Sequence, residues 1–277
     1  MLLQGLYCNW GLYFTSRNIG GIGSEDMATE LSEVGKQFHD VMAENAAAAL
    51  SHNTDISASW FLALLYTRLS ILRTFLEIAE MKGITQDLKK RWLLLQLAPE
   101  KLLGHDIFSH RTRMLDRSPT LLMRRATENQ LQVVLELLEQ LEPESGHVFC
   151  VLDEAQTLTE GGRFAFSTYF RAYDETEQPI LTQTRPLLRS LLLAWGTFLP
   201  NMIISGTGVS MADMETVLGS VVAKESGLRS ETVTNVGAFD DDASLRVYAE
   251  PYLPPKFVDT PAGKELLSRM GYWLHGR

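Results

Sequence analysis

The chain has 277 residues, of which 45% are hydrophobic and 21% charged, a composition typical of a globular fold with a sizeable core. Its 34 acidic and 25 basic residues give a formal net charge of -9, which disfavours extended, non-specific binding to nucleic acid. Its two cysteines, Cys8 and Cys150, lie in apolar runs, which excludes a disulfide framework and a cysteine-based zinc site. The first residues lack the basic region and long apolar stretch of a signal peptide, and no apolar run approaches about 20 residues. We therefore expect an intracellular protein, cytoplasmic or nuclear, with no membrane partner.

The first half of the chain is mainly helical in pattern. Residues 1–10 are expected to end a helix, and Trp10–Thr15 is a short, aromatic-rich run typical of a buried strand. Further helices are expected over four segments: about 25–49 after the N-cap Ser24, 53–81, 85–97 and 120–141. Because this region contains no convincing strand, we interpret about 25–141 as a helical insertion between two strands of a sheet.

The second half returns to alternating strands and helices. Gly146–Leu152 is a continuous apolar run, as expected for a central parallel strand covered on both faces. After it we expect a helix at 186–199, a strand at 201–205, a helix at 211–223, a strand at 232–236 and a helix at 261–273. The sequence therefore predicts an α/β fold with a parallel sheet flanked by helices.

Asp153 and Glu154 directly follow the apolar run Val148–Leu152. In sheets of this kind, ligands bind at the carboxyl ends of the strands, so both carboxylates are expected to face a site. A carboxylate at Asp153 can hold a nucleotide-bound Mg²⁺ through water, and one at Glu154 can polarise the water that attacks the γ-phosphate. The alternative is a strand that merely ends in an acidic turn, because short motifs also arise by chance.

The strand expected at Asn201–Ser205 runs into small polar residues and glycines. Ser205 and Thr207 each place a hydroxyl where it can sense a γ-phosphate beside the acidic strand. A turn built from residues that tolerate unusual backbone angles explains either residue equally well.

The chain contains no Gly-x-x-x-x-Gly-Lys-[Ser/Thr] sequence. Gly35-Lys36 lies in a helical pattern and is followed by Gln37, and Gly20–Ser24 has no lysine and is interpreted as a loop. Since that phosphate-binding loop and its lysine form the main cradle for the β- and γ-phosphates, nucleotide binding is weakened without them.

Four segments carry a resemblance to a known family: Leu2–Phe14, Val151–Gln156, Ile204–Gly208 and Tyr272–Arg277. They look similar, in the same order, to fungal Crinkler-like proteins, which contain P-loop NTPase domains. Leu2–Phe14 resembles the segment directly after the Walker A loop in that group. The resemblance implies an ATPase of the AAA+/STAND kind, with ATP and Mg²⁺ as cofactors if a Walker A loop lies upstream.

The resemblance also implies residue roles. Asp153 and Glu154 stand in the Walker B positions, with Asp153 holding Mg²⁺ through water, and Gln156 is a further cofactor-binding candidate. Ser205 or Thr207 lies near the first sensor, and Arg277, or Arg269 on the same expected helix, stands where a second sensor arginine would.

Relative to that family the first strand and the phosphate-binding loop are missing. We therefore expect one truncated P-loop NTPase-like domain over 1–277, with the insertion at about 25–141 and an α/β core at about 146–277. The expected function is ATP binding that regulates a protein partner or a fused effector, with weak or absent hydrolysis. Oligomerisation of the chain is compatible with this function. The alternative is a catalytically inactive protein-interaction scaffold that uses the exposed faces of the insertion.

Other polar clusters have simpler interpretations. The basic run Lys89–Arg91 and the arginines after it favour a solvated helix face over an anion-binding patch. His105 and His110 lack metal-ligand spacing, so surface exposure outweighs metal binding. Asp240–Asp242 is interpreted as a helix cap, because calcium binding requires an alternating ligand pattern.

Overall fold

The computed structural model describes residues 2–16, 22–41, 46–115, 119–143, 147–160, 165–166, 168–173, 179–183, 186–206, 217, 231 and 242–274. The chain divides into two compact units, Met1–Ser230 and Glu231–Arg277. Within the described residues, no helix is both long enough and apolar enough to cross a bilayer.

A small parallel sheet forms the centre of the first unit. Strands β1 (Gly11–Thr15), β2 (Phe149–Asp153) and β5 (Met202–Ile204) pair in the order β1-β2-β5, which places β2 in the middle. Cys150 to Leu152 in β2 are fully buried, which explains their uninterrupted apolar sequence. Three of the four expected strands and the mixed α/β class are thus confirmed.

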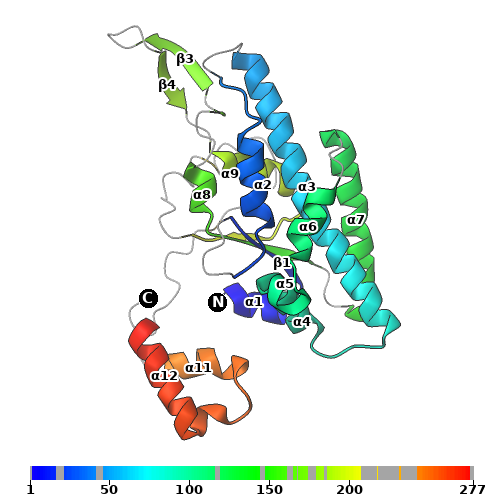
Figure 1. Cartoon of the computed structure of the whole chain (residues 1–277), viewed down its shortest axis with the longest axis vertical. Helices are drawn as coiled ribbons and strands as arrows, with labels where there is room; N and C mark the ends of the chain where they lie inside the picture. Colours follow the sequence, from blue (N-terminus) through cyan, green and yellow to red (C-terminus); the bar gives the residue numbers. More distant parts are fainter. Residues whose placement is uncertain are drawn as a thin grey trace. The chain divides into compact units, whose positions relative to one another are not determined.

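Six helices lie between β1 and β2 in the described part of the chain: α2 (Asp26–Gly35), α3 (Ala46–Met81), α4 (Leu88–Leu97), α5 (Pro99–Leu103), α6 (Ile107–Met114) and α7 (Thr120–Leu141). The long helices α3 and α7 pack along each other (Figure 1). This region of the chain is therefore helical, as expected from its sequence.

The prediction of one helix over about 25–49 is wrong. Helix α2 ends at Gly35, a residue that weakens a helix interior, and α3 begins only at Ala46. Helices α5 and α6 were not expected. Pro99 begins α5, and Asp106 caps α6 by accepting hydrogen bonds from the backbone N–H groups of Phe108 and Ser109 at 3.0 and 3.1 Å.

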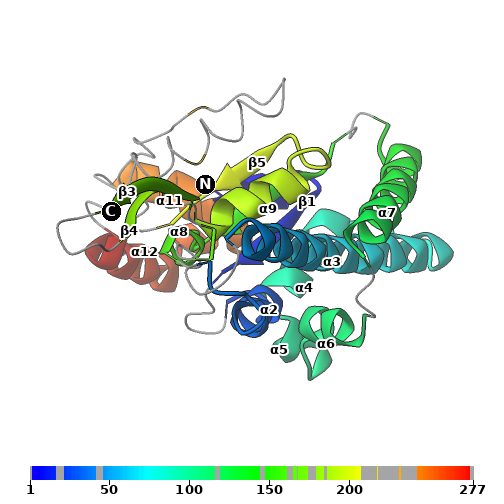
Figure 2. The same cartoon turned by 90° about the horizontal axis from the view of Figure 1, so that it is seen from above.

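Successive side chains of a strand point to opposite faces of the sheet, so the apolar strands present buried side chains on both faces. Helices cover both faces. On one face, Leu12 and Phe14 pack into the main core with α3 and α9 (Leu187–Trp195), where the rings of Phe14 and Trp195 lie 4.5 Å apart. On the other face, Tyr13 and Val151 pack with α1 (Leu2–Cys8) and α4. Figure 2 shows α3 and α9 side by side.

Helix α4 also closes the outer edge of β1. The indole Nε1 of Trp92 donates to the backbone carbonyl of Gly11 at 2.8 Å, and the backbone N–H of Tyr13 donates to Oε1 of Gln96 at 2.8 Å. Gln96 Nε2 also donates to the Gly11 carbonyl at 3.2 Å. Backbone groups that an edge strand would otherwise leave unpaired are therefore satisfied by the insertion.

Two antiparallel strands, β3 (Thr168–Tyr173) and β4 (Pro179–Gln183), follow the short helix α8 (Gln156–Glu160). They were not expected from the sequence. The expected helix at 186–199 is confirmed as α9. The expected helix at 211–223, apart from Val217, and the expected strand at 232–236 lie outside the described residues.

The second unit contains α11 (Asp242–Ala249), the 3-10 turns η1 (Glu250–Tyr252) and η2 (Phe257–Asp259), and α12 (Pro261–Leu274). Helix α12 confirms the expected terminal helix. Gly263 is required where α12 meets η2, because a Cβ atom there would lie 2.0 Å from the carbonyl oxygen of Phe257.

A buried ion pair joins α3 to α2. Arg68 donates from Nε and Nη2 to the two carboxylate oxygens of Asp26 at 2.9 and 2.8 Å, and both side chains are fully buried. We expect Asp26→Ala to lower the free energy of unfolding by about 3–5 kcal/mol, because it leaves a buried charge without its partner. Urea unfolding measures the change.

The matched control is Arg73→Ala, which breaks an exposed ion pair with Glu77 on the same helix. It should cost about 0.5 kcal/mol or less. Equal losses in the two variants would contradict a special role for the buried pair.

Burial raises the pKa of the Cys150 thiol above its ordinary value. A cysteine in the unfolded chain ionises near pH 8.5, so stability contributed by the neutral thiol is complete below about that pH and is lost as the pH rises. We expect the free energy of unfolding to fall by up to about 1.4 kcal/mol per pH unit above it, and Cys150→Ala to remove this component. Cys8→Ala, at an exposed position, should leave the decline unchanged in urea unfolding measured across this range.

Candidate functional site

The three parallel strands bring their carboxyl ends to one edge of the sheet. Thr15 pairs with Asp153, the last residue of β2, and Leu152 pairs with Ile204, the last residue of β5. Polar residues follow at once on each strand: Ser16 after β1, Glu154 after β2 and Ser205 after β5. The candidate site is this polar edge.

Asp153 lies at the centre of the site and both of its carboxylate oxygens accept hydrogen bonds. The Tyr13 hydroxyl on β1 donates to Oδ2 at 3.0 Å, and the Ser205 hydroxyl donates to Oδ1 at 2.6 Å. The backbone N–H of Glu154 also donates to Oδ1, at 3.0 Å. Donors from all three strands therefore fix the orientation of this carboxylate.

Tyr13 is suited to donate because it stays protonated. Burial raises the pKa of its phenol well above the usual value, and the negative charge of Asp153 and the hydrogen bond to it raise that pKa further. Its side chain is almost fully buried, whereas Asp153 is half-buried. The ring thus approaches the carboxylate from the covered side of the sheet.

Glu154 turns the chain sharply after β2. Its φ of 56° lies in the left-handed region, which non-glycine residues adopt rarely. The Ser16 hydroxyl donates to the Glu154 carbonyl, and the Thr157 hydroxyl donates to the same carbonyl at 3.3 Å. These two hydroxyls hold the turn and so determine where the Glu154 carboxylate points.

Gln156 fixes the Glu154 carboxylate by donating from its amide Nε2 to Oε2. The other amide atom, Oε1, is buried and has no hydrogen-bond partner among the described residues. An acceptor in this position is free to receive a hydrogen bond from a ligand or from water.

The geometry fits a divalent cation held through water. A carboxylate offers about four lone-pair sites, and three donors already occupy part of this capacity on Asp153. The remaining capacity suits a water molecule of a hydrated Mg²⁺. Within the described segments, no group of three or more His, Cys, Asp or Glu side chains is placed to bind a metal ion directly.

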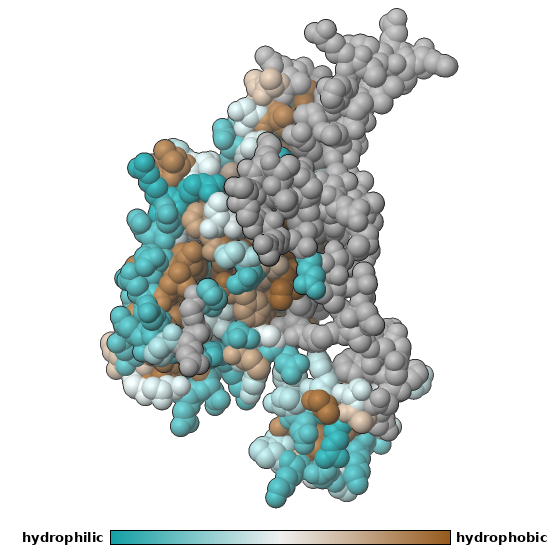
Figure 3. All heavy atoms as spheres, turned by 180° about the vertical axis from the view of Figure 1, so that it is seen from behind, coloured by the Kyte–Doolittle hydropathy of each residue, from teal (hydrophilic) through white to brown (hydrophobic). Residues whose placement is uncertain are grey.

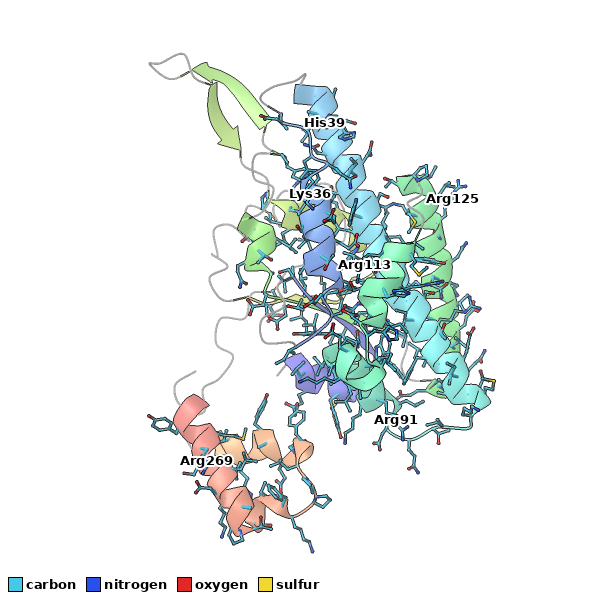
Figure 4. The ribbon with its side chains drawn as sticks, in the orientation of Figure 1. Lys36, His39, Arg91, Arg113, Arg125 and Arg269 are labelled. Atoms are coloured by element: carbon cyan, nitrogen blue, oxygen red, sulfur yellow. The ribbon has the colours of Figure 1, made fainter. Side chains whose placement is uncertain are left out.

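Four of the predicted site residues come together: Asp153, Glu154, Gln156 and Ser205. The other two, Thr207 and Arg277, lie outside the described residues. The substitute for Arg277, Arg269, lies on α12 and pairs with Glu265 at 2.8 Å (Figure 4).

Sequence reasoning missed Tyr13, Ser16 and Thr157. A usable signal was present, because the strand ending at Thr15 was expected to be parallel to the acidic strand. The residues at its carboxyl end must then lie beside Asp153.

Residues of the two segments that were rejected as phosphate-binding loops have structural partners. Lys36, of the Gly35-Lys36 pair that does not form a phosphate-binding loop, pairs with Glu33 at 2.6 Å on the surface. Ser24 donates to the carboxylate of Asp106 at 2.7 Å, so its hydroxyl has a structural partner.

No protein-family model, curated protein or solved structure matches this chain. The likeness to Crinkler-like ATPases therefore stays a prediction, and the functional argument depends on the geometry of the sheet edge.

We expect Tyr13→Phe to lower the free energy of unfolding by about 1.5 kcal/mol, because it removes a hydrogen bond to an ionised group. In an Asp153→Ala background the same substitution should cost much less, giving a coupling energy of about 1 kcal/mol. A double-mutant cycle in urea unfolding measures this coupling. Additive effects of the two substitutions would show that the Tyr13 hydroxyl does not interact with Asp153 in solution.

Proposed function

We propose that the chain is an ATP-binding, P-loop NTPase-like domain that regulates a protein partner or a fused effector. The observation that carries the proposal is the hydrogen bond of 2.6 Å between Ser205, at the end of β5, and Asp153, at the end of the central strand. It joins the two polar strand ends that the sequence singled out independently.

The arrangement of the strands supports a ligand at this edge. Both strand pairings are parallel, and in open parallel sheets ligands bind outside the carboxyl ends of the strands. Asp153 and Glu154 lie on the middle strand, with hydroxyl donors on both neighbouring strands. A nucleotide phosphate with its cation is the ligand that best matches carboxylates set among hydroxyl donors.

Each side chain has a separate task in this proposal. Asp153, oriented by Tyr13 and Ser205, accepts hydrogen bonds from the water shell of Mg²⁺, which when bound would neutralise charge on the phosphates. Glu154, held by Gln156, polarises the attacking water. Hydrolysis by this chain is weak or absent, because it contains no Gly-x-x-x-x-Gly-Lys-[Ser/Thr] sequence.

The second candidate is a catalytically inactive protein-interaction scaffold. It is favoured by large apolar side chains that the helices of the insertion expose, among them Leu102, Met114 and Leu121 at 56%, 69% and 61%. Figure 3 shows apolar areas between hydrophilic ones on the described part of one face. Such areas are common at protein-binding surfaces.

Calorimetry with Mg²⁺-ATP tests the proposal on this chain and on a form extended upstream by a glycine-rich loop ending in Gly-Lys-Thr. We expect binding by the extended form, weaker binding after Asp153→Ala, and unchanged binding but slower turnover after Glu154→Gln. Glu33→Ala, which removes an exposed carboxylate on α2, is the matched control and should bind like the parent. No binding by the extended form would reject the proposal and favour the scaffold.

A further inference from the structure

An exposed tip of the insertion combines cations with large aliphatic side chains. We name the surface formed by α5, the turn after it and α6 the α5–α6 tip. Figures 1 and 2 show α5 and α6 side by side, on the outer side of α3. The exposed side chains that define the tip are Lys101, Leu102, Leu103, His105, His110, Arg111, Arg113 and Met114.

These residues form one surface. The imidazole rings of His105 and His110 lie 6.1 Å apart, which brings the turn after α5 against the exposed side of α6. Met114 lies one helical turn beyond His110 on the same helix. Arg113, labelled on α6 in Figure 4, donates to the Ser109 hydroxyl at 3.2 Å. The two short helices therefore present their cations and aliphatic groups together.

The cations of the tip have no carboxylate partners among the described residues. Five other surface cations are paired at 2.6 to 2.8 Å with carboxylates, namely Lys36, Arg73, Lys89, Arg246 and Arg269. Other exposed cations, among them Lys90 and Arg91 on α4, have no such pair among the described residues. Between Pro99 and Met114 the only exposed carboxylate is Glu100, because Asp106 is buried as the cap of α6. The segment from Pro99 to Met114 thus carries more exposed cations than exposed carboxylates, on a chain of net charge -9. The exposed Glu25, directly before α2, lies next to the turn before α6, where the Glu25 backbone N–H donates to Asp106 at 2.9 Å.

Apolar exposure accompanies the charge. Leu102 and Leu103 are 56% and 46% exposed at the end of α5, and Met114 is 69% exposed at the end of α6. Gly104, in the left-handed conformation, ends α5 directly after the leucine pair. The leucines consequently lie at a turn rather than within a packed helix face.

We propose that the α5–α6 tip binds the surface of an anionic lipid bilayer. Anionic lipid headgroups supply partners for the cations Lys101, Arg111 and Arg113. The side chains of Leu102 and Leu103 are buried at the boundary between the headgroups and the acyl chains. A partner helix would need a row of contacts at i, i+3 and i+4 in a groove, whereas the side chains here come from two helix ends and a turn. Association of this kind needs no spanning helix, but it departs from the sequence-based expectation of no membrane partner.

The test is sedimentation of the full chain with vesicles of phosphatidylcholine alone or with about 30% phosphatidylserine. We expect binding only to the anionic vesicles, with loss of binding at high salt. Lys101→Ala with Arg111→Ala should weaken binding about 25-fold, from about fivefold per cation. Leu102→Ser with Leu103→Ser should weaken it about tenfold or more.

The matched control is Leu121→Ser with Leu122→Ser, a neighbouring pair on α7 with similar exposures of 61% and 53%. It should bind like the parent. Circular dichroism verifies that each variant is folded, which the exposure of all six positions favours.

Two results would overturn the proposal. One is the absence of vesicle binding by the parent chain, or binding that is equal with and without phosphatidylserine. The other is parent-like binding by both tip variants. Labelled poly-L-glutamate is the second probe: if the parent binds it through Lys101 and Arg111 but ignores the vesicles, the tip recognises an acidic protein instead of lipid.

Discussion

The buried ion pair between Arg68 and Asp26 is the contact on which the arrangement of the first unit depends. The guanidinium lies between two aromatic rings, with its Cζ 3.9 Å from the centroid of Phe108 and 4.8 Å from that of Phe14. One side chain on α3 therefore contacts α2, α6 and β1. A charge buried this deeply is tolerated only when its partners are in place, so these four elements must assemble together.

This assembly reaches the candidate site through β1. Phe14 is held by Arg68 on one face of the strand, while Tyr13 points to the other face and donates to Asp153. Trp92 and Gln96 hold the backbone of the same strand along its edge. The insertion thus positions a hydroxyl donor of the site, although its helices contribute no side chain to the hydrogen bonds around Asp153.

Local patterns in the sequence predicted most of the regular elements correctly. The apolar run before Asp153 and the long periodic segment of α3 are strong signals, because burial on both strand faces or along a helix constrains every residue type. The short helices α5 and α6 escaped detection since their signals are single capping residues, Pro99 and Asp106, and not a periodic pattern. Strands β3 and β4 pair mainly with each other and carry no long apolar run.

Part of the site could be predicted in the same way. Asp153, Glu154 and Ser205 are indicated by their positions directly after apolar strands, whereas Tyr13 and Ser16 become visible only once the pairing of β1 with β2 is known. A sequence shows which residues are neighbours along the chain. Which strands lie side by side is determined by tertiary packing, so it could not be deduced from local sequence patterns.

The side chains of α4 that bond to β1 have a consequence for the solubility of the folded chain. An edge strand with free N–H and C=O groups is a template for pairing with strands of other molecules, which leads to fibres and aggregates. Here Trp92 and Gln96 occupy those groups at Gly11 and Tyr13. Helix α4 therefore protects β1 against intermolecular strand addition, and a variant chain that lacks α4 would expose an aromatic-rich strand to its neighbours.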